Sequence, residues 1–343
     1  MSDYIKRSER NKEKKSSKGK NKKGKRKSKK FKVVIGILIA LLIVLGVIGI
    51  IIYKFLGQAN KVSIDDSREN LKISEEAERL AKEKKIKNIL LIGSDEGTVD
   101  DHGRSDSMIL ISIDKENKKI KATSFMRDVL ITIPGYGEKN LNNAYALGGS
   151  ELLVKTFNYN FGLDIKDYAK VDFKAFVKVI DKLGGVDIDI RQDEISVTND
   201  YIKAVNKFVN GSSPTIKKAG VQKLDGVQAL GYSRNRYVGS DFARTNRQRI
   251  VLEAVLQKLS KAGSTEDIKY MNDILPEVTT TLDIKDLTEI GSFALFNKIN
   301  TLESTNFPKS EETQNIVTNE YHMVVDKEKL KKEVQDYIYN DKK

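Results

Sequence analysis

The feature that most constrains this chain is an uninterrupted apolar run at residues 33–53. Its 21 residues carry no charged side chain between Lys32 and Lys54. At 1.5 Å per residue a helix of this length spans about 30 Å, the thickness of the hydrocarbon core of a bilayer. A cleaved signal peptide usually has a shorter apolar region that ends in a small-residue cleavage site, which is not evident here. We therefore predict a single uncleaved transmembrane helix at residues 33–53.

The basic residues of the chain are concentrated before this run. The net charge is +13, and residues 1–30 account for +12 of it, with fifteen Lys and Arg against three acidic residues. The positive-inside rule therefore predicts that residues 1–32 form a cytoplasmic tail and that the chain from about residue 54 lies outside the cell membrane. Because the remainder is nearly neutral and has no recognisable nucleic-acid-binding module, we expect no nucleic-acid partner.

Two residue types that carry much enzyme chemistry are scarce. The chain has no cysteine, which excludes disulfides, thiolate nucleophiles and cysteine-ligated zinc. It has only two histidines, His102 and His322, which gives little support to a Ser-His-Asp site or a histidine-rich metal site. Any chemistry must use carboxylates, arginines, lysines, hydroxyls, backbone amides or a bound metal.

The rest of the chain is predicted to form a stalk and a folded domain. Residues 54–85 include a charged segment typical of a solvated helix, so we expect an extracellular stalk there. From residue 86 on, apolar runs that predict strands alternate with segments that predict helices, which indicates a layered α/β domain at residues 86–263. We expect residues 264–343 to pack on that domain or extend it. The predicted strands are 89–92, 107–114, 119–125, 168–173, 186–190 and 321–326. The predicted helices are 150–162, 174–185, 224–230, 242–261 and a last helix that closes the chain. A polar excursion is predicted at 191–220.

Five of the thirteen arginines lie between residues 231 and 249, although the other basic residues are mostly lysines. A guanidinium is a planar fork that binds carboxylate or phosphate oxygens in pairs, which an ammonium cannot do. In the helix predicted at 242–261, Arg244, Arg247 and Gln248 share one face, and Arg249 lies on another, where we expect a surface residue. The first face continues as an apolar stripe formed by Val251, Leu252, Val255 and Leu259.

This helix has two interpretations. Arginines followed by an apolar stripe, next to the positive end of the helix, suit an anionic head attached to an apolar tail. An ordinary amphipathic helix whose arginines pair with nearby carboxylates has the same pattern. Arg234 and Arg236 point the same way if their segment is extended, and Arg127 follows a predicted strand, but salt bridges, for example to Asp128, would also explain them.

Carboxylates raise a second possibility at the first two strands. Asp95 ends one predicted strand and Asp106 opens the next, so both can meet at the same edge of a sheet. Two carboxylates with room for water and phosphate oxygens are a usual way to hold Mg²⁺. Loops rich in Asp and Gly are also common without any metal.

Six blocks, in order, resemble the LytR-CpsA-Psr family of membrane-anchored envelope proteins. The similarity covers roughly residues 86–263. The blocks are "NILLIGSD", "GRSDSMIL", "SFMRDVLITIPG", "LNNAYALGG", "VDFKAFVKVIDKLGGVDIDI" and "LDGVQALGYSRNRYVGSDFARTNRQR".

The resemblance implies a fold, an activity and a site. It implies an α/β/α sandwich with a central mixed sheet and a long apolar pocket for a polyprenyl chain. Family members are similar in transferring glycopolymers, such as teichoic acids or capsules, from undecaprenyl pyrophosphate to peptidoglycan outside the membrane of Gram-positive bacteria. By motif position, the pyrophosphate would be bound by Arg127, Arg234, Arg236, Arg244 and Gln248, with Arg104 and Arg247 as nearby support, and Asp95 and Asp106 would hold Mg²⁺.

The resemblance leaves the roles of two positions open. Asp241, between the arginines, is either a base or orienting group or only a helix cap. Lys139 stands one residue early relative to the family's Lys-Ile-Asn, here 140–142, so no phosphate role carries over to it. The competing functions are a non-catalytic lipid-pyrophosphate binder or carrier, a regulatory envelope protein, and a phosphatase that uses water as the acceptor.

Overall fold

The computed structural model describes residues 60–343 apart from 97–102, 239, 261–273, 318–319 and 343. The predicted tail and transmembrane helix lie outside this range. None of the helices within it is both long and apolar enough to cross a membrane.

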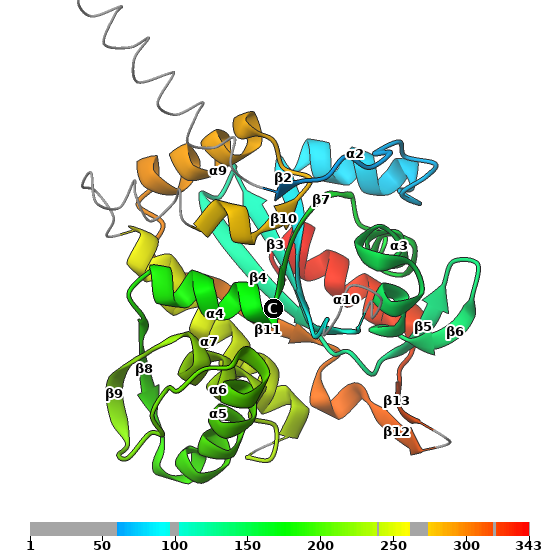
Figure 1. Cartoon of the computed structure of the whole chain (residues 1–343). Helices are drawn as coiled ribbons and strands as arrows, with labels where there is room; N and C mark the ends of the chain where they lie inside the picture. The colour runs from blue at the N-terminus through cyan, green and yellow to red at the C-terminus, as the bar shows by residue number, and fades with distance from the viewer. Residues whose placement is uncertain (1–59, 97–102, 239, 261–273, 318–319, 343) are drawn as a thin grey trace, which may run out of the picture. The chain divides into compact units, whose positions relative to one another are not determined.

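A seven-stranded mixed sheet forms the centre of the structure (Figure 1). The long strand β2 pairs antiparallel with β3 and parallel with β7, and β4 pairs antiparallel with β3. The predicted central mixed sheet is therefore confirmed. The strands, in the order of the sheet, are β1 (Asn60–Lys61), β10 (Thr279–Thr280), β7 (Ile165–Asp172), β2 (Ile86–Ser94), β3 (Ser105–Asp114), β4 (Lys119–Phe125) and β11 (Glu303–Phe307).

Alternation along the strands gives the sheet two apolar faces, because successive side chains point to opposite sides. Leu90, Ile92 and Leu110 face a core covered by α2 (Glu75–Glu83), α3 (Asn143–Phe161) and α10 (Lys327–Asn340). Ile89 and Ile113 face α9 (Ile284–Phe296) on the other side. The same second side carries a group of elements with a core of its own, namely α4 (Phe173–Lys182), β8 (Val186–Ile190), α5 (Ile195–Val209), β9 (Gly220–Leu224), α6 (Gly226–Arg234) and α7 (Ser240–Ser260).

The start of the folded domain differs from the prediction, and the C-terminal part is integrated into the same domain. The segment 60–85, expected to be a stalk, buries Leu71, Ile73, Ala77 and Ala81 in the core. The C-terminal part supplies strands β10 and β11 to the central sheet and the buried helix α10. These pieces belong to one compact unit, Leu56–Lys343, because the core needs their apolar side chains to cover the sheet.

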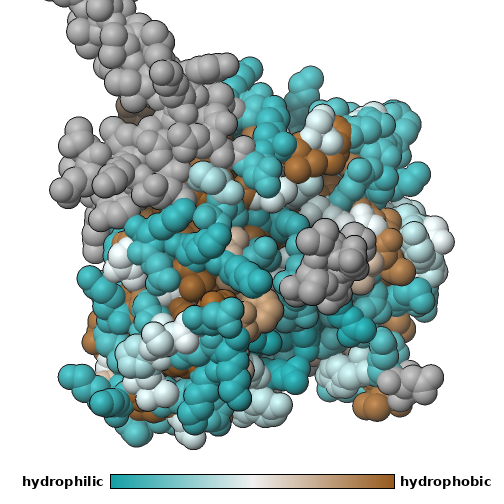
Figure 2. All heavy atoms as spheres, viewed as in Figure 1, coloured by the Kyte–Doolittle hydropathy of each residue, from teal (hydrophilic) through white to brown (hydrophobic). Residues whose placement is uncertain are grey.

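Two hairpins lie beside α3 and α10. One is β5 (Leu130–Ile133) with β6 (Gly137–Asn140), and the other is β12 (Gln314–Val317) with β13 (Tyr321–Val324). Figure 2 shows apolar atoms at the tip of the β12–β13 hairpin, at the lower right of the view. The segment 191–220, expected to be a polar excursion, contains the helix α5, whose Ile202 and Val205 are buried.

Candidate active site

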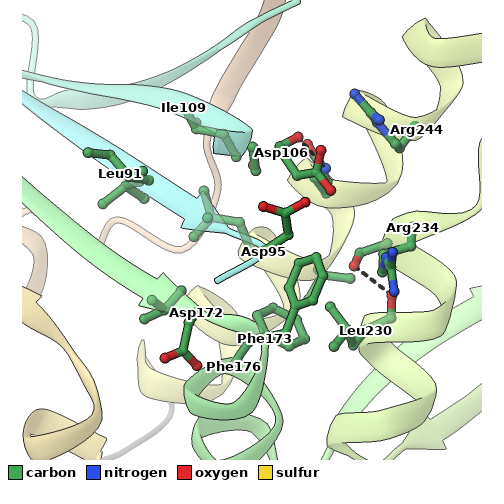
Figure 3. Close-up of a pocket in the computed structure, with 18 of the residues that line it drawn as sticks. Leu91, Asp95, Asp106, Ile109, Asp172, Phe173, Phe176, Leu230, Arg234 and Arg244 are labelled. Carbon is green, nitrogen blue, oxygen red and sulfur yellow. Dashed lines mark hydrogen bonds between the residues drawn. The ribbon is translucent and has the colours of Figure 1, made fainter. Parts of the chain in front are cut away.

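A cavity of about 1030 Å³ lies between the second side of the sheet and α4, α5, α6 and α7. Leu91, Ile109 and Ala169 stand side by side on β2, β3 and β7 and line its sheet side. Figure 3 shows Leu91 and Ile109 on the strands, and Phe173, Phe176 and Leu230 on the helices opposite. Further apolar lining comes from Val171, Val179, Ile180, Val197, Ala204, Val251, Leu252, Val255 and Val278.

Polar side chains also line this cavity. Five guanidiniums and one amide line it, and so do the carboxylates of Asp95 and Asp106. They come from the ends of β2 and β3, from the segment after β4, and from α6 and α7, so that several distant parts of the chain converge here (Figure 3). The guanidiniums and the amide are those of Arg104, Arg127, Arg234, Arg236, Arg244 and Gln248.

A β-bulge places Asp106 in the cavity. The register of β2 and β3 pairs Gly93 with Ser107 but Ser94 with Ser105, so Asp106 is the extra residue. Without the bulge, Asp106 would pair with Ser94, whose side chain is fully buried on the other side of the sheet. An extra residue of this kind re-aims a side chain, which is why bulges are common beside functional sites.

Asp95 is held by the turn that leads into β3. Its Oδ1 accepts a hydrogen bond from the backbone N–H of Arg104 at 2.5 Å. A Cβ added to Gly103 would lie 2.6 Å from the same oxygen, and the φ of Gly103 is +56°. Only glycine combines this backbone conformation with this close approach. The next residue, Glu96, accepts hydrogen bonds from Lys170 at 3.1 Å and from the Tyr145 hydroxyl.

Arg127 and Arg244 form a charge network with three carboxylates. Arg127 donates from Nη1 to Asp106 at 2.5 Å, and Arg244 donates from Nη2 to Asp241 at 2.8 Å. The Nε of Arg127 is buried without a hydrogen bond, 3.5 Å from Asp128 and 4.0 Å from Asp241. Neither Asp128 nor Asp241 lines the cavity.

Burial and charge oppose each other in this network. Burial would lower the pKa of Arg127, but the carboxylates of Asp106, Asp128 and Asp241 outweigh it, so the pKa is raised. Burial dominates for Arg244 and lowers its pKa, with Arg127 adding to the effect. Burial also raises the pKa of Asp128 against the attraction of Arg127. The site therefore holds cations that are desolvated before any ligand arrives.

Arg234 and Arg236 are placed differently, against aromatic rings. The guanidinium of Arg234 lies 4.6 Å from the ring centre of Phe173 and 5.6 Å from that of Tyr201. Arg236 lies 5.5 Å from the ring centre of Tyr237. In the described part of the chain, neither has a carboxylate within ion-pair distance, so both are available to an anion.

Arg247 and Arg249 of α7 are both buried. Arg247, predicted to share a helix face with Arg244 and to support the pyrophosphate site, pairs with Glu194 at 2.8 Å, as the carboxylate-pairing interpretation of this helix expects. Its other nitrogens donate to the backbone oxygens of Asn235 and Val238, both at 2.7 Å. Arg247 thus supports the segment after Arg234 from outside the cavity. Arg249, expected on the surface, is only 8% exposed.

The remaining predicted residues are placed as follows. Arg104 lines the cavity and lies 3.7 Å from Glu320. Lys139 is exposed on β6 and does not line the cavity, whereas the neighbouring Asn140 is buried and holds the β12–β13 hairpin. Sequence reasoning missed the aromatic wall of Phe173 and Tyr201, which no spacing pattern indicates because the two residues are on different helices.

An apolar cavity that is also lined by five guanidiniums has the chemistry to receive an amphiphile with an anionic head. The chain belongs to the LytR_cpsA_psr family, whose model matches residues 51–337.

The relatives and solved structures are similar to most of this chain. Regulatory protein MsrR of Staphylococcus aureus (strain COL) is 32% identical over 261 residues, which are 74% of this chain and 75% of that protein. Polyisoprenyl-teichoic acid–peptidoglycan teichoic acid transferase TagV of Bacillus subtilis (strain 168) is 32% identical over 272 residues, 76% of this chain and 67% of TagV. The structure of YwtF (TagT) of Bacillus subtilis with bound octaprenyl pyrophosphate lipid has a TM-score of 0.54 and 26% identity, and the match covers 74% of this chain and 90% of that one.

Proposed function

We propose that this protein transfers a glycopolymer from undecaprenyl pyrophosphate to peptidoglycan at the outer face of the cell membrane. The observation that carries the proposal is the cavity of about 1030 Å³ that combines an apolar interior with five guanidiniums. Ligand pockets usually measure about 300–1,000 Å³, so this one suits a long apolar chain. The name of TagV and the lipid bound in the YwtF (TagT) structure support the same substrate class.

Different side chains bind the two ends of the donor. The polyprenyl chain occupies the apolar part between the sheet and α4–α7, and the pyrophosphate meets the arginines. Arg234 and Arg236 carry no competing carboxylate among the described residues, so they bind the phosphate oxygens directly. Arg127 and Arg244 already have carboxylate partners at 2.5 and 2.8 Å and add positive charge from positions that are fixed beforehand.

The reaction needs little covalent chemistry from the protein. The acceptor oxygen forms a bond to the polymer-bearing phosphorus, the bond from that phosphorus to the bridging oxygen breaks, and undecaprenyl phosphate leaves. Negative charge accumulates on the leaving phosphate, so fixed guanidiniums aimed at it lower the barrier. Asp241 orients Arg244 through their ion pair, which favours an orienting role for Asp241 over that of a base.

The two predicted metal ligands suit Mg²⁺ as a partial set. Both carboxylates line the cavity beside the arginines, and Mg²⁺ is commonly bound by one or two carboxylates together with substrate phosphates. Within the described ranges there is no cluster of three or more His, Asp or Glu placed to hold a metal, so phosphate oxygens must complete the set. Asp95 and Asp106 would hold the ion, which would neutralise charge on the pyrophosphate.

Purified full-length chain tests the proposal directly. The chain is mixed with a synthetic polyprenyl-pyrophosphate-linked polymer carrying a label and with peptidoglycan fragments, with Mg²⁺ or with chelator. We expect labelled peptidoglycan only with Mg²⁺, and loss of turnover in Asp95→Ala and Asp106→Ala. Tight donor binding without transfer would establish a carrier instead, release of the polymer to water would establish a hydrolase, and full activity in chelator would exclude the metal.

A further inference from the structure

The β12–β13 hairpin is attached to the site at three points. The backbone N–H of Met323 donates to the carbonyl of Asp128 at 2.8 Å, and the two strands continue as a bridge between Val129 and Met323. Asn140 donates from Nδ2 to the carbonyl of Tyr321 at 2.9 Å. Glu320 lies 3.7 Å from Arg104, which lines the cavity. The hairpin therefore forms one side of the site.

One face of the hairpin continues outward from the buried Met323 and remains largely exposed. Met323 is buried in the core, and Tyr321 and Val317 are on the same face because side chains alternate along a strand. Tyr321 is 39% exposed and Val317 is 75% exposed. Figure 2 shows the apolar atoms at this tip. An exposed ring beside an exposed aliphatic group offers an apolar surface to a ligand.

Asp128 and Asp241 both lie within 4.0 Å of Arg127, and Asp128 also touches the hairpin through the backbone N–H of Met323. Burial raises the pKa of Tyr321, and the charges of Asp128 and Asp241 raise it further, which places both carboxylates near its phenol. Neither carboxylate lines the cavity, and Asp128 adjoins the hairpin, because its carbonyl accepts the backbone N–H of Met323 at 2.8 Å. The two differ in their partners. Asp241 is tied to Arg244 at 2.8 Å, whereas the ion-pair contact of Asp128, to Arg127, is at 3.5 Å.

We propose that the face formed by Tyr321 and Val317 binds the acceptor glycan and that Asp128 accepts the proton of its attacking hydroxyl. The inference rests on the proposed function and adds the acceptor side to it. As the hydroxyl oxygen bonds to phosphorus, its proton passes to a carboxylate oxygen of Asp128, and the bridging oxygen leaves on the lipid phosphate. A sugar ring offers an apolar C–H face and hydroxyls together, which suits the ring and polar tip of a tyrosine.

The environment of Asp128 suits this role. Burial raises its pKa, and a base whose pKa is closer to the working pH accepts a proton more readily. It is half-buried, next to the desolvated Nε of Arg127, which would stabilise the carboxylate between turnovers.

Isosteric amide variants of the two carboxylates test the base. In a single-turnover assay, Asp128→Asn should lower the rate of transfer to peptidoglycan fragments about 100-fold or more. Its dissociation constant for octaprenyl pyrophosphate should stay within about twofold of wild type, and Asp128→Glu should restore part of the rate. Asp241→Asn should instead weaken lipid binding, because it releases Arg244. Asp128→Asn that transfers at the wild-type rate, or that loses lipid binding as much as transfer, would overturn the proposal.

A matched pair of tyrosine variants tests the surface. Tyr321→Ala should raise the KM for the peptidoglycan fragment at least fivefold with the donor KM unchanged. Tyr159→Ala, which removes a ring that is 54% exposed on α3, should leave both unchanged. Equal effects of the two substitutions would refute the acceptor surface. A wild-type chain that binds donor but never transfers would overturn the proposed function itself, whereas normal transfer by both tyrosine variants would overturn only this inference.

Discussion

Arg247 and Glu194 form a buried ion pair in which the side chains are 3% and 4% exposed. The Nε of Arg247 donates to Glu194 at 2.8 Å, and the other oxygen of Glu194 accepts the backbone N–H of Arg191 at 3.0 Å. The pair joins α7 to the start of α5 and holds the segment that carries Arg234 and Arg236. An arginine of the cluster that suggested anion binding is therefore part of the scaffold.

We expect Arg247→Met to destabilise the fold. Removing one partner of a buried pair leaves the other charge desolvated and costs about 3–5 kcal/mol of unfolding free energy. Urea denaturation of the full chain measures it, with Arg191→Met as the control because the Arg191–Asp193 pair is exposed and should matter little. Similar unfolding midpoints for the two variants would show that the buried pair adds nothing.

Arg244→Lys should weaken donor binding by about tenfold to a hundredfold. A lysine keeps the charge but not the guanidinium fork that pairs with Asp241 while it faces the cavity, so the charge is no longer held in position; hydrogen bonds to charged groups contribute about 1.5–3 kcal/mol. Titration with octaprenyl pyrophosphate in detergent measures the affinity. Arg249→Lys is the control on the same helix. It should lower the unfolding midpoint and leave lipid affinity unchanged, because Arg249 is buried outside the cavity.

Gly103→Ala should reduce Mg²⁺-dependent turnover more than stability. The added methyl group would lie 2.6 Å from Oδ1 of Asp95 and push the carboxylate out of place. The positive φ adds strain of about 1 kcal/mol. Gly220→Ala separates the two effects, since Gly220 also has a positive φ but nothing within 4 Å of the new atom. If both variants keep full turnover, Asp95 does not depend on this contact.

Asp128→Asn should stabilise the fold increasingly as the pH rises. The folded-state pKa of Asp128 is raised by burial, so the folded state binds the proton more tightly than the unfolded state. The contribution of Asp128 to stability therefore falls as the pH rises from the unfolded pKa, near 4, through the raised folded pKa. Denaturation of both proteins between pH 4 and pH 7 measures the difference. A variant whose relative stability falls with pH would contradict the raised pKa.

The transmembrane topology also remains a prediction. Because the charge of +12 precedes the apolar run at 33–53, we expect protease added to wall-stripped cells to digest the C-terminal domain. The basic tail, detected through a tag at the N-terminus, should survive together with a cytoplasmic marker. Protection of the domain under conditions that digest a known external protein would refute the extracellular location.

Local pattern predicted much of the central sheet and several of its helices. The strand β4 has the predicted ends, 119–125, and β8 has the predicted ends, 186–190, because alternation and apolar runs report directly on strands. The helix at residues 242–261 was found within two residues at its start. The helix α5 was missed because its exposed side is polar and its buried side becomes visible only against α6 and α7.

The sequence by itself determined which residues can bind an anion and which share a helix face, since these follow from side-chain chemistry and the 100° step of a helix. Only the tertiary structure decided what each face meets. Helix α7 packs against α6 and β8 on one side and against β4 and β11 on another, so Arg244 reaches the cavity, Arg247 reaches Glu194 and Arg249 is buried. The periodicity of one helix carries no information about its neighbours, because those neighbours come from distant parts of the chain and are brought together only by the packing of the core.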